Sequence, residues 1–209
     1  MINFADMIWE RCCTGVDQVR QSRDGNASRV ELCSHLELDG LTPSHGDIEA
    51  SVALGIPVNV MVRPRGGRFV YSEDEVSIML EQIEFCGRAG ASAVVAGCLD
   101  DKYGIDVAAT SRLVERAARF GLGFTFHRAF DLCPDKEKSL GELIDIGCTR
   151  VLTSGGAPTA MEGAFVIARL LCISAGRIIV MPGGGVTPSN VSRLKSLTGA
   201  SEFHGTRLY

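Results

Sequence analysis

The sequence predicts an α/β fold, a (β/α)₈ TIM barrel whose last helix is short or missing. Three observations lead to this prediction. Short apolar runs rich in Val and Ile alternate with longer amphipathic stretches, as in parallel sheets with helical crossovers. The runs number eight, which closes a barrel, although an open doubly wound sheet would show the same alternation. Five residues follow the last run, which ends at His204, and this leaves no room for a full eighth helix.

The predicted strands are apolar along their whole length, as expected for strands buried on both faces. They cover 7–13, 29–33, 57–63, 92–96, 123–127, 149–154, 177–181 and 201–204. A hydrophobic period near 3.6 predicts helices over 73–90, 106–120, 136–147 and 159–175. Thr42-Pro43 and Thr187-Pro188 each place a capping hydroxyl before a proline, which predicts two further helix starts. No linker divides the chain, so residues 1–209 are predicted to form a single domain.

The composition is that of an ordinary globular domain. Hydrophobic residues make up 45% of the 209 residues and charged residues 22%, with a net charge of −4. An acidic chain is not expected to bind nucleic acid over its whole surface. Neither a signal peptide nor a membrane-length apolar stretch is seen, so we expect a cytoplasmic protein without membrane contact. In that compartment the eight cysteines are expected to be reduced.

Polar residues gather where the predicted strands end, at the barrel face that carries active sites. The candidate catalytic residues are Glu10 or Glu31 as general base and His127 as general acid. A purely structural alternative is that the two carboxylates form salt bridges with Arg63 or Arg128 and close the barrel mouth. Five strands contributing ionisable groups to one end favour a binding site over that alternative.

A second group of residues is suited to binding a small anion. Glycine-rich loops after the sixth and seventh strands expose backbone N–H groups, and arginines offer a planar fork to phosphate or carboxylate. The loop after the third strand is interpreted as a lid that delivers Arg63 and Arg65. Tight turns alone would also explain the glycines. The candidate anion-binding residues are Arg63, Arg65, Arg128, Ser154, Gly183, Gly184 and His204.

Several long motifs resemble those of the CutC family. They are VELCSHLELDGLTPSHG (30–46), VRPRGGRFVYSEDE (62–75), TFHRAFDLC (125–133), RVLTSGG (150–156), MPGGGVTPSN (181–190) and EFHG (202–205). The resemblance covers the chain from Glu10 onward. It implies a (β/α)₈ barrel, a cytoplasmic location, a homo-oligomer and a role in copper homeostasis, with copper bound through cysteines.

Cys12 and Cys33 are the candidate copper ligands, because Cu(I) prefers soft thiolates and the two residues end neighbouring strands. Cys13 is expected on the opposite strand face from Cys12. The sequence therefore supports two functional hypotheses. The first is a CutC-like protein of copper homeostasis that binds Cu(I). The alternative is a barrel enzyme, an isomerase, lyase or hydrolase, acting on a small anionic or phosphorylated metabolite at the barrel mouth.

Overall fold

Eight parallel strands form the centre of the protein in a computed structural model that describes residues 7–206. The strands are β1 (Ile8–Cys13), β2 (Arg29–Leu32), β3 (Val58–Met61), β4 (Ala93–Ala96), β5 (Gly123–Phe126), β6 (Arg150–Thr153), β7 (Ile179–Pro182) and β8 (Glu202–Gly205). Their order is β7-β6-β5-β4-β3-β2-β1-β8, so sequential strands are neighbours and β8 returns to β1. β7 and β8 lie in contact without a ladder between them in the described residues, and the barrel is nearly closed.

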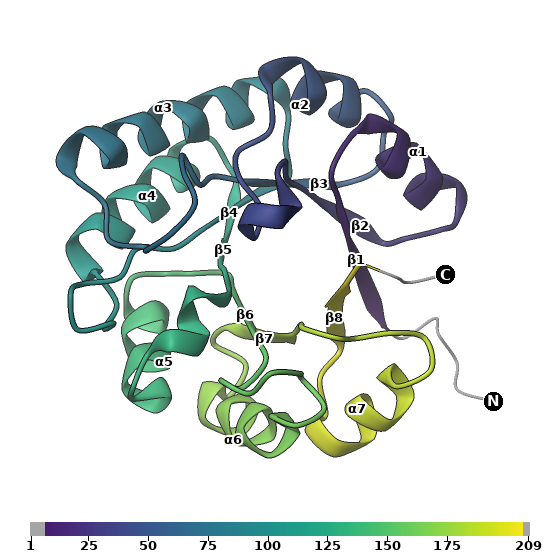
Figure 1. The fold of residues 1–209 in the computed structure, drawn as a ribbon, viewed down its shortest axis with the longest axis vertical. Helices are drawn as coiled ribbons and strands as arrows, with labels where there is room; N and C mark the ends of the chain where they lie inside the picture. The colour runs from purple at the N-terminus through teal and green to yellow at the C-terminus, as the bar shows by residue number, and fades with distance from the viewer. Residues whose placement is uncertain (1–6, 207–209) are drawn as a thin grey trace.

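Helices surround the strands as an outer ring (Figure 1). They are α1 (Val16–Asp24), α2 (His45–Val52), α3 (Glu73–Ala89), α4 (Val107–Arg119), α5 (Lys136–Asp145), α6 (Ala164–Ser174) and α7 (Val191–Thr198), with short 3-10 helices η2 (Leu36–Leu38) and η3 (Arg128–Leu132). The predicted barrel is thus confirmed. The described residues end at Thr206, one residue after β8. No helix within the described residues is long and apolar enough to cross a bilayer.

Three predicted helix starts are wrong, and one helix was not predicted. The helix predicted over 159–175 begins only at Ala164, because residues 160–163 form a turn. The predicted start at Thr42-Pro43 is wrong, because α2 begins at His45 with the Ser44 hydroxyl accepting from the amide of Asp47. The predicted start at Thr187-Pro188 is also wrong: these residues form a turn, and α7 begins at Val191. The sequence analysis missed α1, whose short, polar sequence buries only Val19 and Ser22.

The two faces of the strands differ in chemistry. Outward-facing residues form the main apolar core beneath the helices, and they include Val30, Leu32, Val58, Val60, Val94, Phe124, Phe126, Val151, Val180 and Phe203. Inward-facing residues are largely polar and still buried, and they include Glu10, Arg29, Glu31, Asn59, Thr125, His127, Arg150, Glu202 and His204. The barrel is therefore filled by a polar network rather than by an apolar plug.

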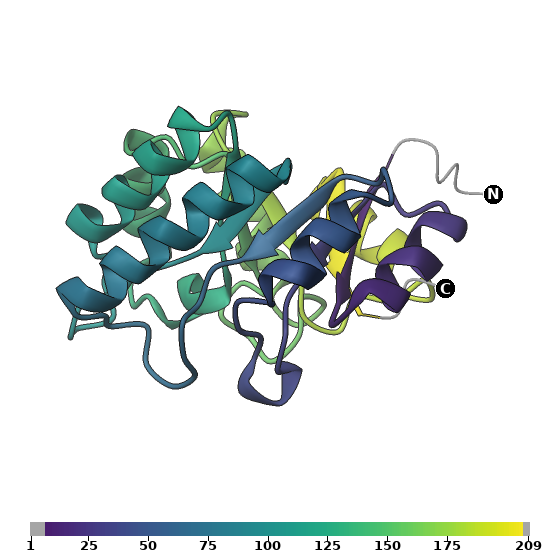
Figure 2. The same ribbon diagram turned by 90° about the horizontal axis from the view of Figure 1, so that it is seen from above.

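That network is closely hydrogen-bonded. Glu202 accepts from Arg29 Nη2 at 2.5 Å and from Arg150 Nε at 2.7 Å through the same carboxylate oxygen. Glu10 accepts from Arg29 Nε at 2.6 Å and from Asn59 Nδ2 at 2.7 Å. Because buried charges need partners, this network fixes the charged side chains below the carboxyl ends of the strands. In Figure 2 η2 and its neighbouring loops project from the edge of the molecule at which β1 ends.

Candidate functional site

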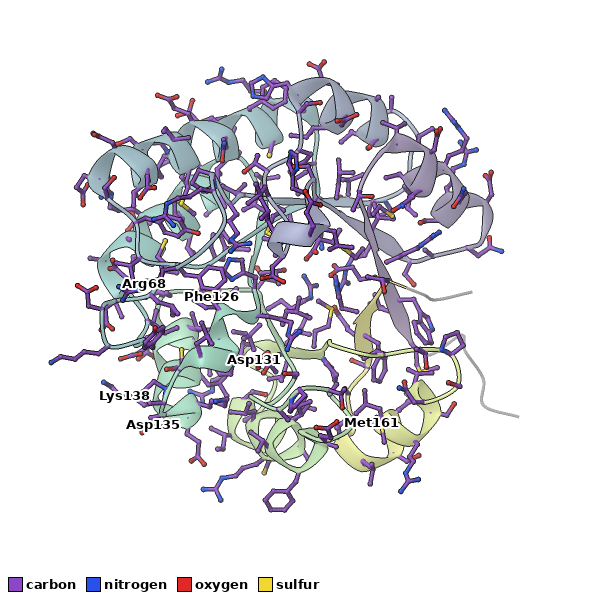
Figure 3. The ribbon with its side chains drawn as sticks, in the orientation of Figure 1. Arg68, Phe126, Asp131, Asp135, Lys138 and Met161 are labelled. Carbon is purple, nitrogen blue, oxygen red and sulfur yellow. The ribbon has the colours of Figure 1, made fainter. Side chains whose placement is uncertain are left out.

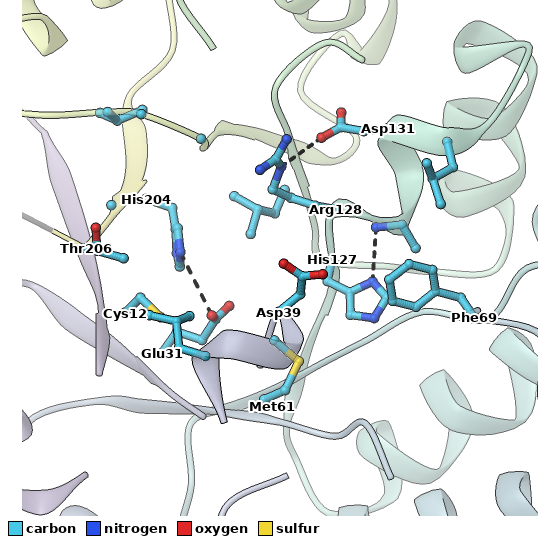
Figure 4. A pocket seen from close by; sticks show the side chains of 18 of the residues that line it. Cys12, Glu31, Asp39, Met61, Phe69, His127, Arg128, Asp131, His204 and Thr206 are labelled. Atoms are coloured by element: carbon cyan, nitrogen blue, oxygen red, sulfur yellow. Dashed lines mark hydrogen bonds and ion pairs between the residues drawn. The ribbon is translucent and has the colours of Figure 1, made fainter. Parts of the chain in front are cut away.

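A cavity of about 680 Å³ opens at the carboxyl ends of the strands. Its walls come from distant parts of the chain (Figure 4). They are formed by Cys12, Glu31, Leu36, Asp39, Met61, Phe69, His127, Arg128, Ala129, Asp131, Leu132, Leu152, Gly184, Gly185, Val186, Thr187, His204, Gly205 and Thr206. The C-terminal face of a barrel is where such sites lie, and the cavity is the candidate functional site.

Sulfur atoms lie at the base of this cavity. The Sγ atoms of Cys12 and Cys33 are 3.7 Å apart, and both side chains form one small buried cluster with Met61 and Val95. Cys13 belongs instead to the outer core, next to the Ser22 hydroxyl, as its predicted opposite orientation requires. The hydrogen-bonding contact with Cys33, together with burial, raises the pKa of Cys12. Cys12 is therefore held as a protonated thiol.

A carboxylate–imidazole–carboxylate series lies beside the sulfur atoms. His204 Nδ1 is 2.9 Å from Glu10 Oε1, and His204 Nε2 is 3.9 Å from Glu31 Oε1. Burial by itself would lower the pKa of His204, but the charge of Glu31 and the hydrogen bond to Glu10 raise it to about 9. Burial raises the pKa of Glu31, whose Oε2 is buried without a hydrogen-bond partner. His204, predicted as an anion ligand, thus links the two predicted bases.

Glu10 lies deeper than a substrate-facing base would. Its side chain is fully buried and does not form part of the cavity wall. Burial acts to raise the pKa of Glu10, but the hydrogen bond from His204 and the charge of Arg29 outweigh it and lower the pKa to about 2. Glu10 is therefore an ionised acceptor that orients His204, and of the two predicted bases Glu31 is the one that faces the cavity.

His127 is a neutral imidazole in this setting. Burial and then the charge of Arg63 lower its pKa to about 3. Its Nδ1 accepts from the amide of Ala129 at 3.3 Å, so the proton resides on Nε2, which has no partner. The geometry therefore favours His127 as a neutral hydrogen-bond donor through Nε2, rather than as the predicted general acid in its charged imidazolium form.

Arg128 is the arginine that reaches the cavity. Its Nε donates to Asp131 Oδ2 at 2.8 Å and its Nη2 donates to the Ser154 hydroxyl at 2.9 Å. Its Nη1 lies against Gly184, where a Cβ would be 3.2 Å away. Gly184 has φ +96°, a left-handed conformation that glycine adopts without strain. The absence of a side chain at this position also leaves room for the Arg128 guanidinium. Gly183 lies behind this loop and donates its amide to the Thr153 carbonyl.

Arg63 and Arg65 do not form part of the cavity wall. Arg63 donates to the backbone carbonyls of Leu38 and Gly40 and lies over the Phe69 ring. Arg65 forms a two-point ion pair with Glu75. Arg63 thus ties its loop to the segment after β2, and Arg65 donates to carbonyls of its own loop and to Glu75. The geometry gives no support to their predicted delivery to an anion.

Asp131 is a site residue that the sequence analysis did not select. It accepts from the Thr153 hydroxyl at 2.5 Å and from the amides of Ser154 and Gly156. Figure 3 places it near the middle of the ring, whereas Asp135 and Lys138 lie toward the rim. Its position three residues after Arg128, in the HRAFD sequence, is the signal that could have identified it as the partner that fixes this arginine.

Two donor sets in the cavity could hold a metal ion. One is the sulfur pair of Cys12 and Cys33. The other consists of Cys12, Glu31 and His204, whose ligand atoms all lie within 4.8 Å of one another. The two sets share Cys12, so a single ion would select one of them.

The chain is similar to known proteins over most of its length. The model of the CutC family matches residues 7–208. A family protein CutC from Xylella fastidiosa (strain Temecula1) is 47% identical over 186 residues, which are 88% of this chain and 69% of that protein. One from Parabacteroides distasonis is 44% identical over 199 residues, 94% of this chain and 81% of that protein. The crystal structure of a CutC protein from Streptococcus agalactiae, named for copper homeostasis, superposes with a TM-score of 0.91 and 36% identity, covering 97% of this chain and all of that one.

Proposed function

The chain belongs to the CutC family, and from this premise we propose that it acts in copper homeostasis by binding Cu(I) between Cys12 and Cys33. The observation that carries the proposal is the 3.7 Å separation of the two sulfur atoms at the base of the cavity. Thiolate and thioether sulfur are the ligands that Cu(I) prefers. Met61 adds a thioether to the same cluster. Cys12 faces the cavity, which gives the ion a path from solvent.

Hard cations are poorly matched to this sulfur pair. Mg²⁺ and Ca²⁺ require shells of oxygen ligands, and the cluster around Cys12 and Cys33 supplies sulfur and aliphatic carbon. Binding of Cu(I) by two thiolates would release the thiol protons to solvent and leave a site with one net negative charge. In this proposal copper is the cargo of the protein. The homo-oligomer and the cytoplasmic location implied by the resemblance stay predictions.

Anaerobic titration with Cu(I) against a strong competing chelator tests this function. The exposed Cys172 is first replaced by serine, so that a surface thiol does not bind the ion. We expect one Cu(I) per chain, and a loss of affinity greater than about 100-fold in Cys12→Ser/Cys33→Ser. Cys13→Ser is the matched control, since its sulfur faces the outer core. Equal affinity in the double variant and in the control would contradict the proposal.

A second candidate function is an enzyme acting on a small anionic or phosphorylated metabolite in the same cavity. Arg128 favours it: Nη1 has no protein partner within the described residues and lies beside Gly184. The amides of Gly184, Gly185 and Val186 likewise donate no hydrogen bond in that part of the chain. Free amides next to a guanidinium form a typical oxyanion site, and the loop after the seventh strand is a common phosphate site of this fold.

Binding of inorganic phosphate, measured by calorimetry, tests this second candidate. Arg128→Gln is expected to weaken binding about tenfold or more, because a charge-assisted hydrogen bond is lost. Arg68→Gln removes an exposed arginine that pairs with Asp101 outside the cavity, and it serves as the control. Phosphate affinity that is the same in both variants would remove Arg128 from the site.

A further inference from the structure

We propose that Cys12, Glu31 and His204 form a site for a divalent cation of the zinc class at the base of the cavity, with one coordination position open to the cavity. The proposal does not rest on Cu(I) binding. The zinc ligands include the Glu31 carboxylate and the His204 imidazole in place of the Cys33 sulfur. Both sites include Cys12, so the two metals would compete for it. It goes beyond the second candidate function by naming a metal next to the anion site.

The donor set has the composition of a catalytic zinc site. Zn²⁺ is bound by thiolate sulfur, imidazole nitrogen and carboxylate oxygen, and its catalytic sites keep three protein ligands and one open position. Sulfur, nitrogen and oxygen are supplied here by three residues from β1, β2 and β8, which are neighbours in the barrel. All three side chains border the cavity, so a fourth ligand could enter from there.

The distances between the three ligand atoms would fit a tetrahedral zinc site after a small contraction. The three ligand atoms lie within 4.8 Å of one another, and His204 Nε2 is 3.9 Å from Glu31 Oε1. In a tetrahedral site with bonds of about 2.0–2.3 Å, neighbouring ligand atoms are about 3.5 Å apart. Figure 4 shows Cys12 and Glu31 close together, with His204 facing them. Side-chain rotations are sufficient to close such a gap.

Glu10 supplies the outer partner that a metal-binding histidine usually has. A ligating imidazole commonly donates its second N–H to a carboxylate, which fixes the ring and its tautomer. Glu10 accepts from Arg29 and Asn59 and is therefore an acceptor toward His204 Nδ1 as well. The Nδ1 proton then points to Glu10, and Nε2 faces Glu31 and the metal position.

Glu31 provides an independent observation that points to a cation bound between Cys12, Glu31 and His204. Its Oε2 is buried without a hydrogen-bond partner, and the residue is 3% exposed. An unpaired carboxylate oxygen in such a place costs free energy, which a cation would offset. A dication together with the Cys12 thiolate and the Glu31 carboxylate gives a site without net charge. The thiol proton of Cys12 and the Nε2 proton of His204 pass to solvent when the metal binds.

Metal titration of the chelator-treated protein tests the site, again in the Cys172→Ser background. We expect one Zn²⁺ per chain in competition with a chromogenic chelator, and a loss greater than about 100-fold in His204→Gln or Glu31→Gln. His45→Gln is the matched control, because His45 stacks on Phe85 outside this cavity. Co²⁺ used as a spectroscopic probe should show a sulfur-to-metal charge-transfer band that Cys12→Ser removes.

A Cys33 substitution distinguishes the proposed zinc site from the proposed copper site, because only the copper site includes Cys33. Cys33→Ser should keep the Zn²⁺ affinity and the Co²⁺ band while Cu(I) binding falls, whereas His204→Gln should do the reverse. Thermal unfolding of each metal-free variant identifies any that fail to fold. Zn²⁺ affinity unchanged in folded His204→Gln and Glu31→Gln, or a wild-type protein that does not compete with the chelator, would overturn the proposal.

Discussion

Glu202→Gln is expected to lower the free energy of unfolding by about 3–5 kcal/mol. One oxygen of Glu202 accepts from both Arg29 and Arg150 inside the barrel, and these side chains are at most 10% exposed. Removing the negative charge leaves buried Arg150 without a carboxylate partner and leaves Arg29 with Glu10 alone. Urea unfolding followed by circular dichroism measures the change.

The control for this substitution is Glu73→Gln. Glu73 pairs with Arg112 on the surface, where its side chain is 83% exposed. Exposed pairs contribute about 0–1 kcal/mol, so the same change of charge should have little effect there. Similar losses in the two variants would show that the buried network contributes no more than a surface pair.

Gly163→Ala is expected to destabilise the protein by about 1–3 kcal/mol or more. The backbone of Gly163 has φ −86°, which alanine adopts readily, so the effect is purely steric. A Cβ there would lie 1.8 Å from the carbonyl oxygen of Ser154, and α6 would have to move away from the loop after β6. Because Ser154 accepts from Arg128, phosphate binding should weaken as well.

Gly141→Ala provides the matched control. Gly141 lies within α5, and nothing is found within 4 Å of its added Cβ. Alanine in an open helix position should stabilise by about 0.5–1 kcal/mol. Melting temperatures of the two variants should therefore shift in opposite directions. A Gly163→Ala variant as stable as the wild type would contradict this prediction, because it would show that the loop after β6 can move away from the added methyl group without loss of stability.

The architecture and part of the site could be predicted from the amino-acid sequence alone. Alternation of apolar runs with amphipathic stretches indicated a parallel α/β fold, because each pattern fits one kind of element, and the number of runs favoured a barrel over an open sheet. The closeness of Cys12 and Cys33 followed from two neighbouring parallel strands, and the opposite orientation of Cys13 followed from the strand period. The positions of Glu31 and Arg128 at the barrel mouth follow from the strand direction, because the carboxyl ends of parallel strands all lie at one end of the barrel.

Tertiary structure decided which charged groups meet. Glu10 and His204 are separated by nearly the whole chain, and the pairing of β1 with β8 brings them together. Arg63 and Arg65 looked equivalent to Arg128 in the sequence. In the structure Arg63 donates to the Leu38 carbonyl in η2, and Arg65 donates to the Val70 carbonyl and to Glu75. Such partners depend on strand register and loop conformation. Residue type and spacing do not specify these, because a guanidinium group bonds to whichever acceptor the fold places within its reach.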